Sequence, residues 1–145
     1  MKNKRDMATD TFSTGINCAA SVFSAFCEDY GIGQEMARKL ACGLGGGCRA
    51  GEVCGAVSGA ALVVGLKHGQ WLGEDKETKA LCSDKTAEFI AAFKARQPAL
   101  TCRDLLGVDV STITPDERQE LFQDKRHICV SAVGDAAAIL EELGY

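Results

Sequence analysis

Eight cysteines are the residues of this chain with the most distinctive chemistry. They lie at positions 18, 27, 42, 48, 54, 82, 102 and 129 of 145 residues. In a reducing compartment, so many thiols indicate metal binding or redox work more than structural disulfides. The alternative is that all eight are small hydrophobic core residues, because free cysteine is among the most buried residue types.

Two of these cysteines, Cys48 and Cys54, lie in a segment rich in small residues, GLGGGCRAGEVCGAVSGAA, from Gly43 to Ala61. The glycines are too dense for a regular element, so we expect a loop followed by a buried helix from Glu52 to Leu66. Cys54 then falls in the first turn of that helix, where unpaired N–H groups and the helix dipole favour an anion. Thiol pKa values can fall to about 3.5–7.5 in such a setting. With Arg49 nearby, we therefore expect Cys54 to be the most acidic or the most tightly ligated of the eight thiols.

The glycine loop is also a candidate site for a phosphate-bearing or thiol-bearing cofactor at the start of a helix. Its candidate residues are Gly45, Gly46, Gly47, Arg49 and Gly55. A close-packed turn is the simpler explanation of the same glycines. The loop partly matches a dinucleotide-binding fingerprint, but no strand is expected before it, so we set that match aside.

Three further cysteines fall in the first turn of an expected helix. Cys18 follows a run of capping residues, Cys102 follows a capping threonine, and Cys129 joins them if the last helix restarts just before it. Filler cysteines should fall in the middle of helices instead. We therefore expect Cys18, Cys54, Cys102 and Cys129 to form one site.

The other four cysteines receive different interpretations. Cys27 and Cys82 lie on apolar helix faces and are better explained as core residues with raised pKa values. Cys42 and Cys48 flank the glycine loop, which leaves open a site larger than four ligands.

The chain is expected to be helical nearly throughout, because no segment alternates with period 2 and several repeat apolar residues every 3.6 positions. The predicted fold is all-α: a single-domain bundle of five or six helices over residues 1–145, with the glycine-rich loop before a buried central helix. Residues 1–12 form either an opening helix or a flexible N-terminal segment. Thr114, Pro115 and Glu117 predict a helix start with a capping box. That last helix either runs to Leu143 or breaks near residues 125–127.

Composition excludes some classes of partner. A net charge of −4 and a pI near 5.2 argue against nucleic acid or a membrane surface. The longest apolar stretch, residues 53–66, is shorter than the about 20 residues that span a bilayer. No signal peptide is recognisable, so we expect a cytoplasmic protein. The small residues on the central helix favour a homodimer, although they would serve packing within one chain equally well.

These motifs, taken in order, resemble a known family. Gly15-x-Asn17-Cys18-Ala19, Cys54-Gly55-Ala56-x-x-Gly59, Cys102-x-x-Leu105-Leu106-Gly107 and Cys129 are similar to the bacterial and archaeal redox-active proteins named C_GCAxxG_C_C. A related domain occurs in the dimeric split-Soret cytochromes, where it accompanies an iron–sulfur cluster. The resemblance therefore implies a four-cysteine redox site in a homodimer. Haem is not expected, because the chain lacks Cys-x-x-Cys-His.

Two chemistries suit four thiols that only the fold brings together. One is dithiol/disulfide exchange, which would make the chain a thiol-dependent oxidoreductase with a redox partner or small-molecule substrate of unknown identity. The other is a non-catalytic module that binds an iron–sulfur cluster or, less readily, zinc through the same cysteines. Zinc is disfavoured because the four cysteines lie 36, 48 and 27 positions apart and form no tight chelating pair.

Overall fold

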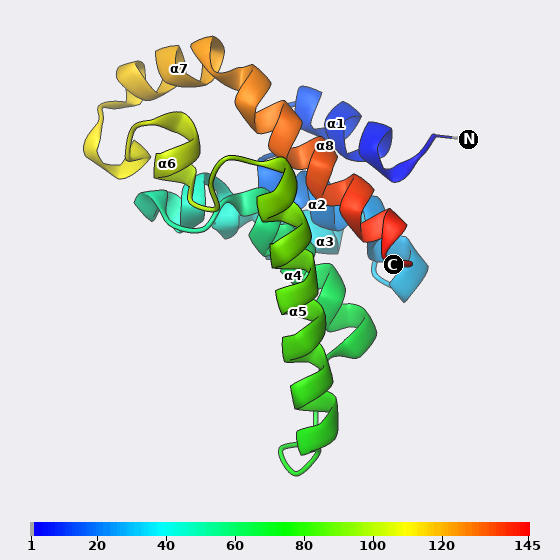
Figure 1. Ribbon diagram of the computed structural model, residues 1–145. Coiled ribbons are helices and arrows are strands. Elements are labelled where there is room, and N and C mark those ends of the chain that lie inside the picture. The colour runs from blue at the N-terminus through cyan, green and yellow to red at the C-terminus, as the bar shows by residue number, and fades with distance from the viewer. Residues whose placement is uncertain (1) are drawn as a thin grey trace.

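Eight α-helices make up most of residues 2–145, the part of the chain that this computed structural model describes (Figure 1). They are α1 (Lys4–Ser13), α2 (Cys18–Phe26), α3 (Gln34–Ala41), α4 (Gly55–His68), α5 (Lys76–Arg96), α6 (Cys102–Leu106), α7 (Pro115–Asp124) and α8 (Arg126–Glu142). No β-strand occurs in this range, only an isolated antiparallel bridge between Val53 and Thr101. The all-α class is confirmed, with more helices than the five or six expected.

The additional helices have local causes. Residues 4–13 form α1, because Asn3 caps its first turn by accepting a hydrogen bond from the Asp6 N–H at 2.8 Å. The chain between Pro115 and Glu142 breaks at Lys125, whose φ of −110° and ψ of 16° are not helical. The alternative in which the last helix restarts is therefore the one observed.

The buried centre of the molecule is the contact between α2 and α4. All but one of the residues of α2 are buried, and α4 buries seven small or β-branched residues. A Cβ added at Gly59 would collide with the carbonyl oxygen of Ala19, so glycine is needed for the two backbones to lie this close. α1 packs on α8 at one side of this centre.

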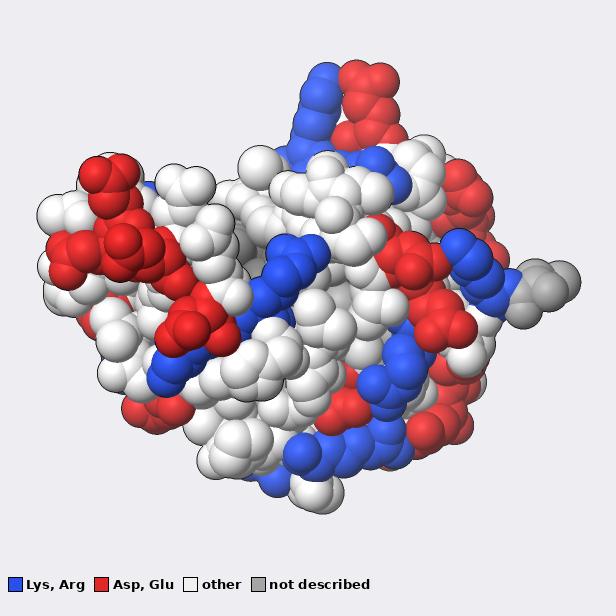
Figure 2. Space-filling view, turned by 90° about the horizontal axis from the view of Figure 1, so that it is seen from above, with Lys and Arg blue, Asp and Glu red and all other residues white. Residues whose placement is uncertain are grey.

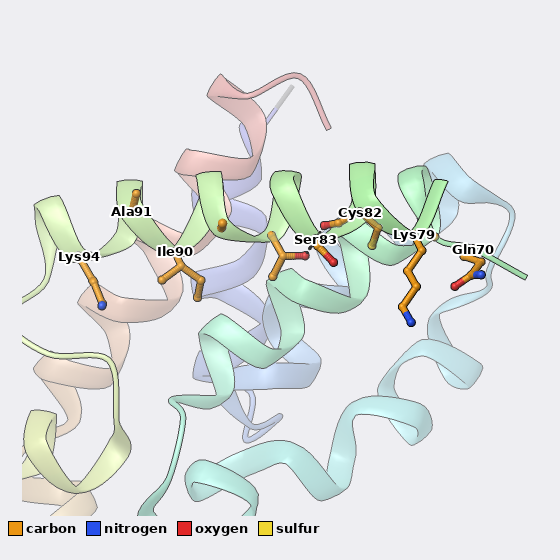
Figure 3. Close-up of a pocket in the computed structure, with 10 residues that line it drawn as sticks. Gln70, Lys79, Cys82, Ser83, Ile90, Ala91 and Lys94 are labelled. Atoms are coloured by element: carbon orange, nitrogen blue, oxygen red, sulfur yellow. Dashed lines mark hydrogen bonds between the residues drawn. The ribbon is translucent and has the colours of Figure 1, made fainter. Parts of the chain in front are cut away.

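The hairpin formed by α4 and α5 projects away from the other helices (Figure 1). α5 is anchored by Phe89 and Phe93, which are its two buried residues. Along one face of its length runs a groove of about 850 Å³, with Lys79 and Lys94 near its two ends (Figure 3). Cys82 lines this groove. It is half-buried and packs against the outside of the core, whereas the sequence predicted a core residue.

The glycine loop is a sequence of tight turns, as expected. Gly46 and Gly47 have φ values of 67° and 63°, which glycine adopts without strain. Cys48 and Arg49 follow with φ of 60°, a left-handed conformation that is uncommon for residues with a Cβ. The helix after the loop begins at Gly55 rather than at Glu52, and Cys54 is its N-cap residue.

Charge is unevenly distributed over the surface. Acidic side chains gather at the end of the molecule where α7 lies (Figure 2), and α7 carries four of them within ten residues. Within residues 2–145, no helix combines the length and apolar character required to cross a membrane.

Candidate functional site

Cys18 is placed by the start of α2. The preceding residue, Asn17, caps the helix by accepting a hydrogen bond from the Ala20 N–H at 3.0 Å. The same side chain donates from Nδ2 to the carbonyl oxygen of Cys42 at 2.7 Å. One asparagine therefore fixes both the helix that carries Cys18 and the position of the glycine loop beside it.

Cys54 and Cys102 are held side by side by backbone hydrogen bonds. The Cys54 N–H donates to the Leu100 carbonyl at 2.9 Å, and the Cys102 N–H donates to the Glu52 carbonyl at 2.7 Å. These bonds flank the Val53–Thr101 bridge and join the start of α4 to the start of α6. A short paired segment thus connects two thiols that lie 48 positions apart in the sequence.

Cys129 reaches the same place because the chain breaks before α8. The helix restarts at Arg126, so Cys129 falls in its first turn. The break is fixed by Lys125, whose ammonium donates to the carbonyl oxygen of Leu106 at the end of α6, at 3.1 Å. This contact ties the beginning of α8 to the helix that carries Cys102.

All four cysteines line one small, largely enclosed cavity of about 30 Å³. Its other walls are glycine backbone and apolar side chains: Gly46, Gly55, Leu105, Leu106, Phe122, Ile128 and Ala132. Four helix beginnings, each with the partial positive charge of a helix N-terminus, therefore converge on one apolar space. A thiolate in this cavity is therefore more stable than a thiolate in an apolar cavity without helix N-termini.

Gly55 is the residue that lets the first two cysteines meet. A Cβ at this position would collide with Sγ of Cys18 and lie 3.1 Å from the carbonyl oxygen of Leu44. The sulfur of Cys18 thus packs directly on the backbone at the start of α4. Any larger residue would displace it.

Burial dominates the electrostatics of the thiols. It raises the pKa of Cys54 and that of Cys129 to about 12, and the pKa of Cys102 to about 11. The Cys18 thiolate adds to this by raising the pKa of each of the other three, which shows that the sulfurs are close enough to interact. The pKa of Cys18 is also raised by burial, although the backbone N–H groups of Gly46, Ala19 and Gly55 partly offset the effect.

The expected low pKa of Cys54 is therefore wrong for the reduced, metal-free protein. Cys54 is only 7% exposed, so loss of hydration outweighs the helix terminus. Arg49 does not compensate, because its side chain is exposed and does not line the cavity.

The residues proposed for cofactor binding separate into two groups. Gly46 and Gly55 line the cavity, whereas Gly45, Gly47 and Arg49 do not. Gly45 allows close approach of the Asn17 side chain, with a hypothetical Cβ 2.7 Å from Nδ2, and Gly47 lies against the backbone of Glu52. These two glycines shape the loop and provide no surface to the cavity.

The remaining cysteines lie outside the cavity. Cys27 is fully buried and its thiol donates to the carbonyl oxygen of Ser24, which agrees with a core role. Cys42 and Cys48 are exposed and line neither the cavity nor the hollow beside it.

The four thiols do not form a ready-made metal site. Among residues 2–145, no three His, Cys, Asp or Glu side chains lie close enough together to hold a metal ion in the conformations seen. The donor types fit an iron–sulfur cluster, whereas the cavity has room for little more than one water molecule. Any group bound there would have to move the thiols apart.

A second hollow, of about 210 Å³, adjoins the cavity and is missed by the sequence reasoning. It shares Cys18, Gly46, Phe122 and Cys129 with the cavity. Arg126 contributes the charged side chain of its lining, three residues before Cys129 and thus on the same helix face. The three-residue spacing between Arg126 and Cys129 is the sequence signal that indicates this arginine beside the thiol.

Comparison with known families matches residues 16–143 to the family described as "Putative redox-active protein (C_GCAxxG_C_C)". The chain belongs to this family. The match covers most of the chain, including all four cysteines of the cavity, so the resemblance found in the sequence is confirmed. Searches of curated proteins and of solved structures found no match. Membership of C_GCAxxG_C_C places the chain in a family described as redox-active and assigns no role to any single cysteine.

Proposed function

We propose that Cys18, Cys54, Cys102 and Cys129 form a single redox centre. The observation that carries this proposal is their convergence, from the beginnings of four helices, on one enclosed apolar cavity. The effect of Cys18 on the pKa of Cys54, Cys102 and Cys129 supports it, because one thiolate raises the pKa of another in this way only at short range. The redox-active family gives the same class of function.

Electron transfer through a cysteine-held iron–sulfur cluster is the chemistry that the thiol pKa values favour. Disulfide exchange requires a thiolate nucleophile, and a pKa of about 12 leaves on the order of one thiol in 10⁵ ionised at neutral pH. A bound cationic centre reverses this balance by stabilising thiolates directly. The four cysteines would hold the cluster, which would supply one-electron transfer. The apolar walls and the converging helix beginnings would keep water out and stabilise the anionic sulfurs.

A reversible disulfide is the second candidate, and the absence of a ready-made metal geometry among residues 2–145 favours it. In this reaction two thiols form an S–S bond and release two protons and two electrons to an external oxidant. Cys18 is the natural shared partner, because it interacts with each of the other three. Burial restricts the reaction to small oxidants or to thiols within the cavity.

We also propose that the protein works in a reducing compartment such as the cytoplasm. All eight cysteines are unpaired in the structure, and an oxidising compartment would expose Cys42 and Cys48 to indiscriminate disulfide formation.

Anaerobic purification followed by iron and acid-labile sulfide analysis tests the proposal. An iron–sulfur centre gives both elements in a fixed ratio and a visible absorption band, whereas a dithiol centre gives metal-free protein whose cysteines lose two hydrogens per disulfide on oxidation. Each single serine variant of the four cysteines should abolish the signal of an iron–sulfur centre. For a dithiol centre, Cys18→Ser and the variant of its disulfide partner should abolish the loss of hydrogens. Cys82→Ser, at a half-buried thiol outside the cavity, is the matched control and should retain either signal. If all four variants behaved like the control, the proposed centre would be wrong.

A further inference from the structure

The hollow beside the cysteine cavity connects the buried thiols with the surface. Its lining includes Phe12, Cys18, Gly46, Phe122, Arg126 and Cys129. Because four of these residues also line the cavity, the two spaces meet at Cys18 and Cys129. Cys54 and Cys102 line only the cavity and not the hollow, so a molecule that enters from the hollow reaches them last.

The lining of the hollow contains a single formal charge, that of Arg126. Its guanidinium lies 4.8 Å from the centre of the Phe12 ring and donates weakly to the Phe12 carbonyl at 3.4 Å. Among residues 2–145 no carboxylate forms a salt bridge with it, although α7, immediately before, carries four acidic residues. A guanidinium has five N–H donors, so most of its hydrogen-bonding capacity is available to a ligand.

The size of the hollow limits what it can hold. About 210 Å³ is below the range of about 300–1,000 Å³ that is usual for drug-sized ligands. It accommodates a molecule of a few non-hydrogen atoms, with an apolar side against Phe12 and Phe122 and a charged group at Arg126.

We propose that this hollow is the entrance to the four-cysteine centre and that Arg126 makes it selective for small organic anions. The inference rests on the redox function proposed above and adds to it the class of molecule that reaches the thiols. Arg126 is here a binding and positioning residue. The phenyl rings flank the path, and Cys18 and Cys129 are the first sulfurs that an entering molecule meets.

Paired alkylating reagents test this proposal in the reduced, metal-free chain. Iodoacetate is an anion and iodoacetamide is neutral, yet both react in the same way: the thiolate sulfur displaces iodide and forms an S–C bond. The ratio of the two rates at one thiol therefore cancels its pKa and its exposure to a first approximation. Mass spectrometry of peptides gives this ratio for each cysteine.

In the Arg126→Gln variant, the iodoacetate-to-iodoacetamide ratio at Cys18 and Cys129 should fall about two- to fivefold, as expected for loss of one partly exposed ionic contact. Arg126→Lys should retain part of the preference. The ratio at Cys42, which is exposed and does not line the hollow, should stay unchanged. Arg103→Gln is the matched control, because Arg103 adjoins Cys102 but pairs with Glu52 and lies outside the hollow.

If the ratio at Cys18 and Cys129 were unchanged in Arg126→Gln, Arg126 would not select anions. If Cys54 and Cys102 were labelled before Cys18 and Cys129, the hollow would not be the entrance to the centre. Neither result depends on metal content or redox activity. The iron, sulfide and disulfide measurements above can therefore fail or succeed independently of this experiment.

Discussion

Gly55 controls the distance between the central helix and the sulfur of Cys18. The hydrogen atom on its Cα leaves room for Sγ, and its N–H is one of three neighbouring backbone N–H groups that oppose the rise in the pKa of Cys18. The Gly in the motif Cys54-Gly55-Ala56 is therefore required by close approach, since its backbone conformation is ordinary helix.

Changing Gly55 to Ala should displace Cys18 and destabilise the protein. The new methyl group would be forced against Sγ and against the Leu44 carbonyl, and overpacking of this kind costs about 1–3 kcal/mol. Urea unfolding of the reduced protein measures the cost, and the yield of the iron–sulfur or disulfide signal measures the displacement.

Gly65→Ala is the matched control on the same helix. Nothing lies within 4 Å of a Cβ built there, so the change should stabilise the helix by about 0.4–1 kcal/mol and leave the centre intact. Equal effects of the two substitutions would show that helix propensity, and not contact with Cys18, determines the outcome.

Cys54 shows where sequence reasoning at the residue level fails. The helix terminus predicted from the glycine loop exists, but it contributes typically 0.3–1 kcal/mol to an anion. Raising the pKa of Cys54 from its ordinary value of 9.0 to about 12 corresponds to about 4 kcal/mol, so burial outweighs the dipole. The sequence indicated the terminus, whereas the burial of Cys54 comes from the core that α2 and α4 form by packing on each other, and that packing has no local signal.

At the scale of elements, α7 is the most weakly attached helix beside the site. None of its residues is buried, and its start depends on a capping box between Thr114 and Glu117. Phe122 nevertheless forms part of the cavity wall. Opening of α7 would therefore expose the thiols without unfolding the rest of the chain.

Thr114→Ala should increase local opening of α7 with little effect on global stability. Loss of an N-cap costs about 1 kcal/mol, which corresponds to about fivefold faster hydrogen exchange in residues 115–124. Alkylation of Cys102, which is 8% exposed, should accelerate in parallel because the helix helps to cover it.

The N-cap of α5 provides the control for this prediction. Asp75→Ala removes the acceptor for the Thr78 N–H, at 3.1 Å, on a helix whose start is remote from the cavity. It should speed exchange at the beginning of α5 and leave Cys102 labelling unchanged. If Cys102 were labelled equally fast in both variants, α7 would not control access to the site.

Helix boundaries followed from the sequence where a cap residue marks them. Thr114 and Pro115 predicted the start of α7, and the cap before Cys18 predicted α2. The break at Lys125 remained one of two alternatives, because it is fixed by a contact with the Leu106 carbonyl far away in the sequence. The helix starting at Gly55 was expected three residues too early, since residues 52–54 pair with residues 100–102 instead.

On the scale of the whole molecule, the buried thiols make stability depend on pH. In reduced, metal-free protein the pKa values of Cys54, Cys102 and Cys129 lie at about 11–12, above the ordinary 9.0 that applies to the unfolded chain. Between these values the folded state binds more protons than the unfolded state. The free energy of unfolding should therefore fall as pH rises. Between pH 9 and pH 10 the loss should be about 1 kcal/mol per thiol.

Urea titrations at pH 8, 9 and 10 under strong reductant measure this loss. A variant with Cys54, Cys102 and Cys129 all changed to alanine is the comparison, because lysine and tyrosine titrate equally in both proteins. The variant should lose less stability between pH 8 and pH 10 than the native chain. Parallel decline would mean that the three thiols ionise as freely in the folded protein as in the unfolded one.

The gathering of four cysteines was predictable, because Cys18 and Cys102 follow capping residues, Cys54 follows the glycine loop, Cys129 follows a chain break, and the motifs resemble a family. The hollow that leads to them was not. Its walls come from α1, α2, α7 and α8 and from the loops before α2 and α4. Phe12 and Phe122 lie in helices with no sequence pattern that relates them. Non-local packing of this kind is set by the whole fold.

The separation of the four cysteines along the chain gives the centre a mechanical consequence. A covalent link across the cavity would close a loop, for example the 36 positions between Cys18 and Cys54, and remove about 4 kcal/mol of chain entropy from the unfolded state. A bridging ligand would constrain three such loops at once. Formation or reduction of a disulfide there, or loss of a bridging ligand, would then change the free energy of unfolding, and the rate at which a protease cleaves the chain would follow the state of the centre.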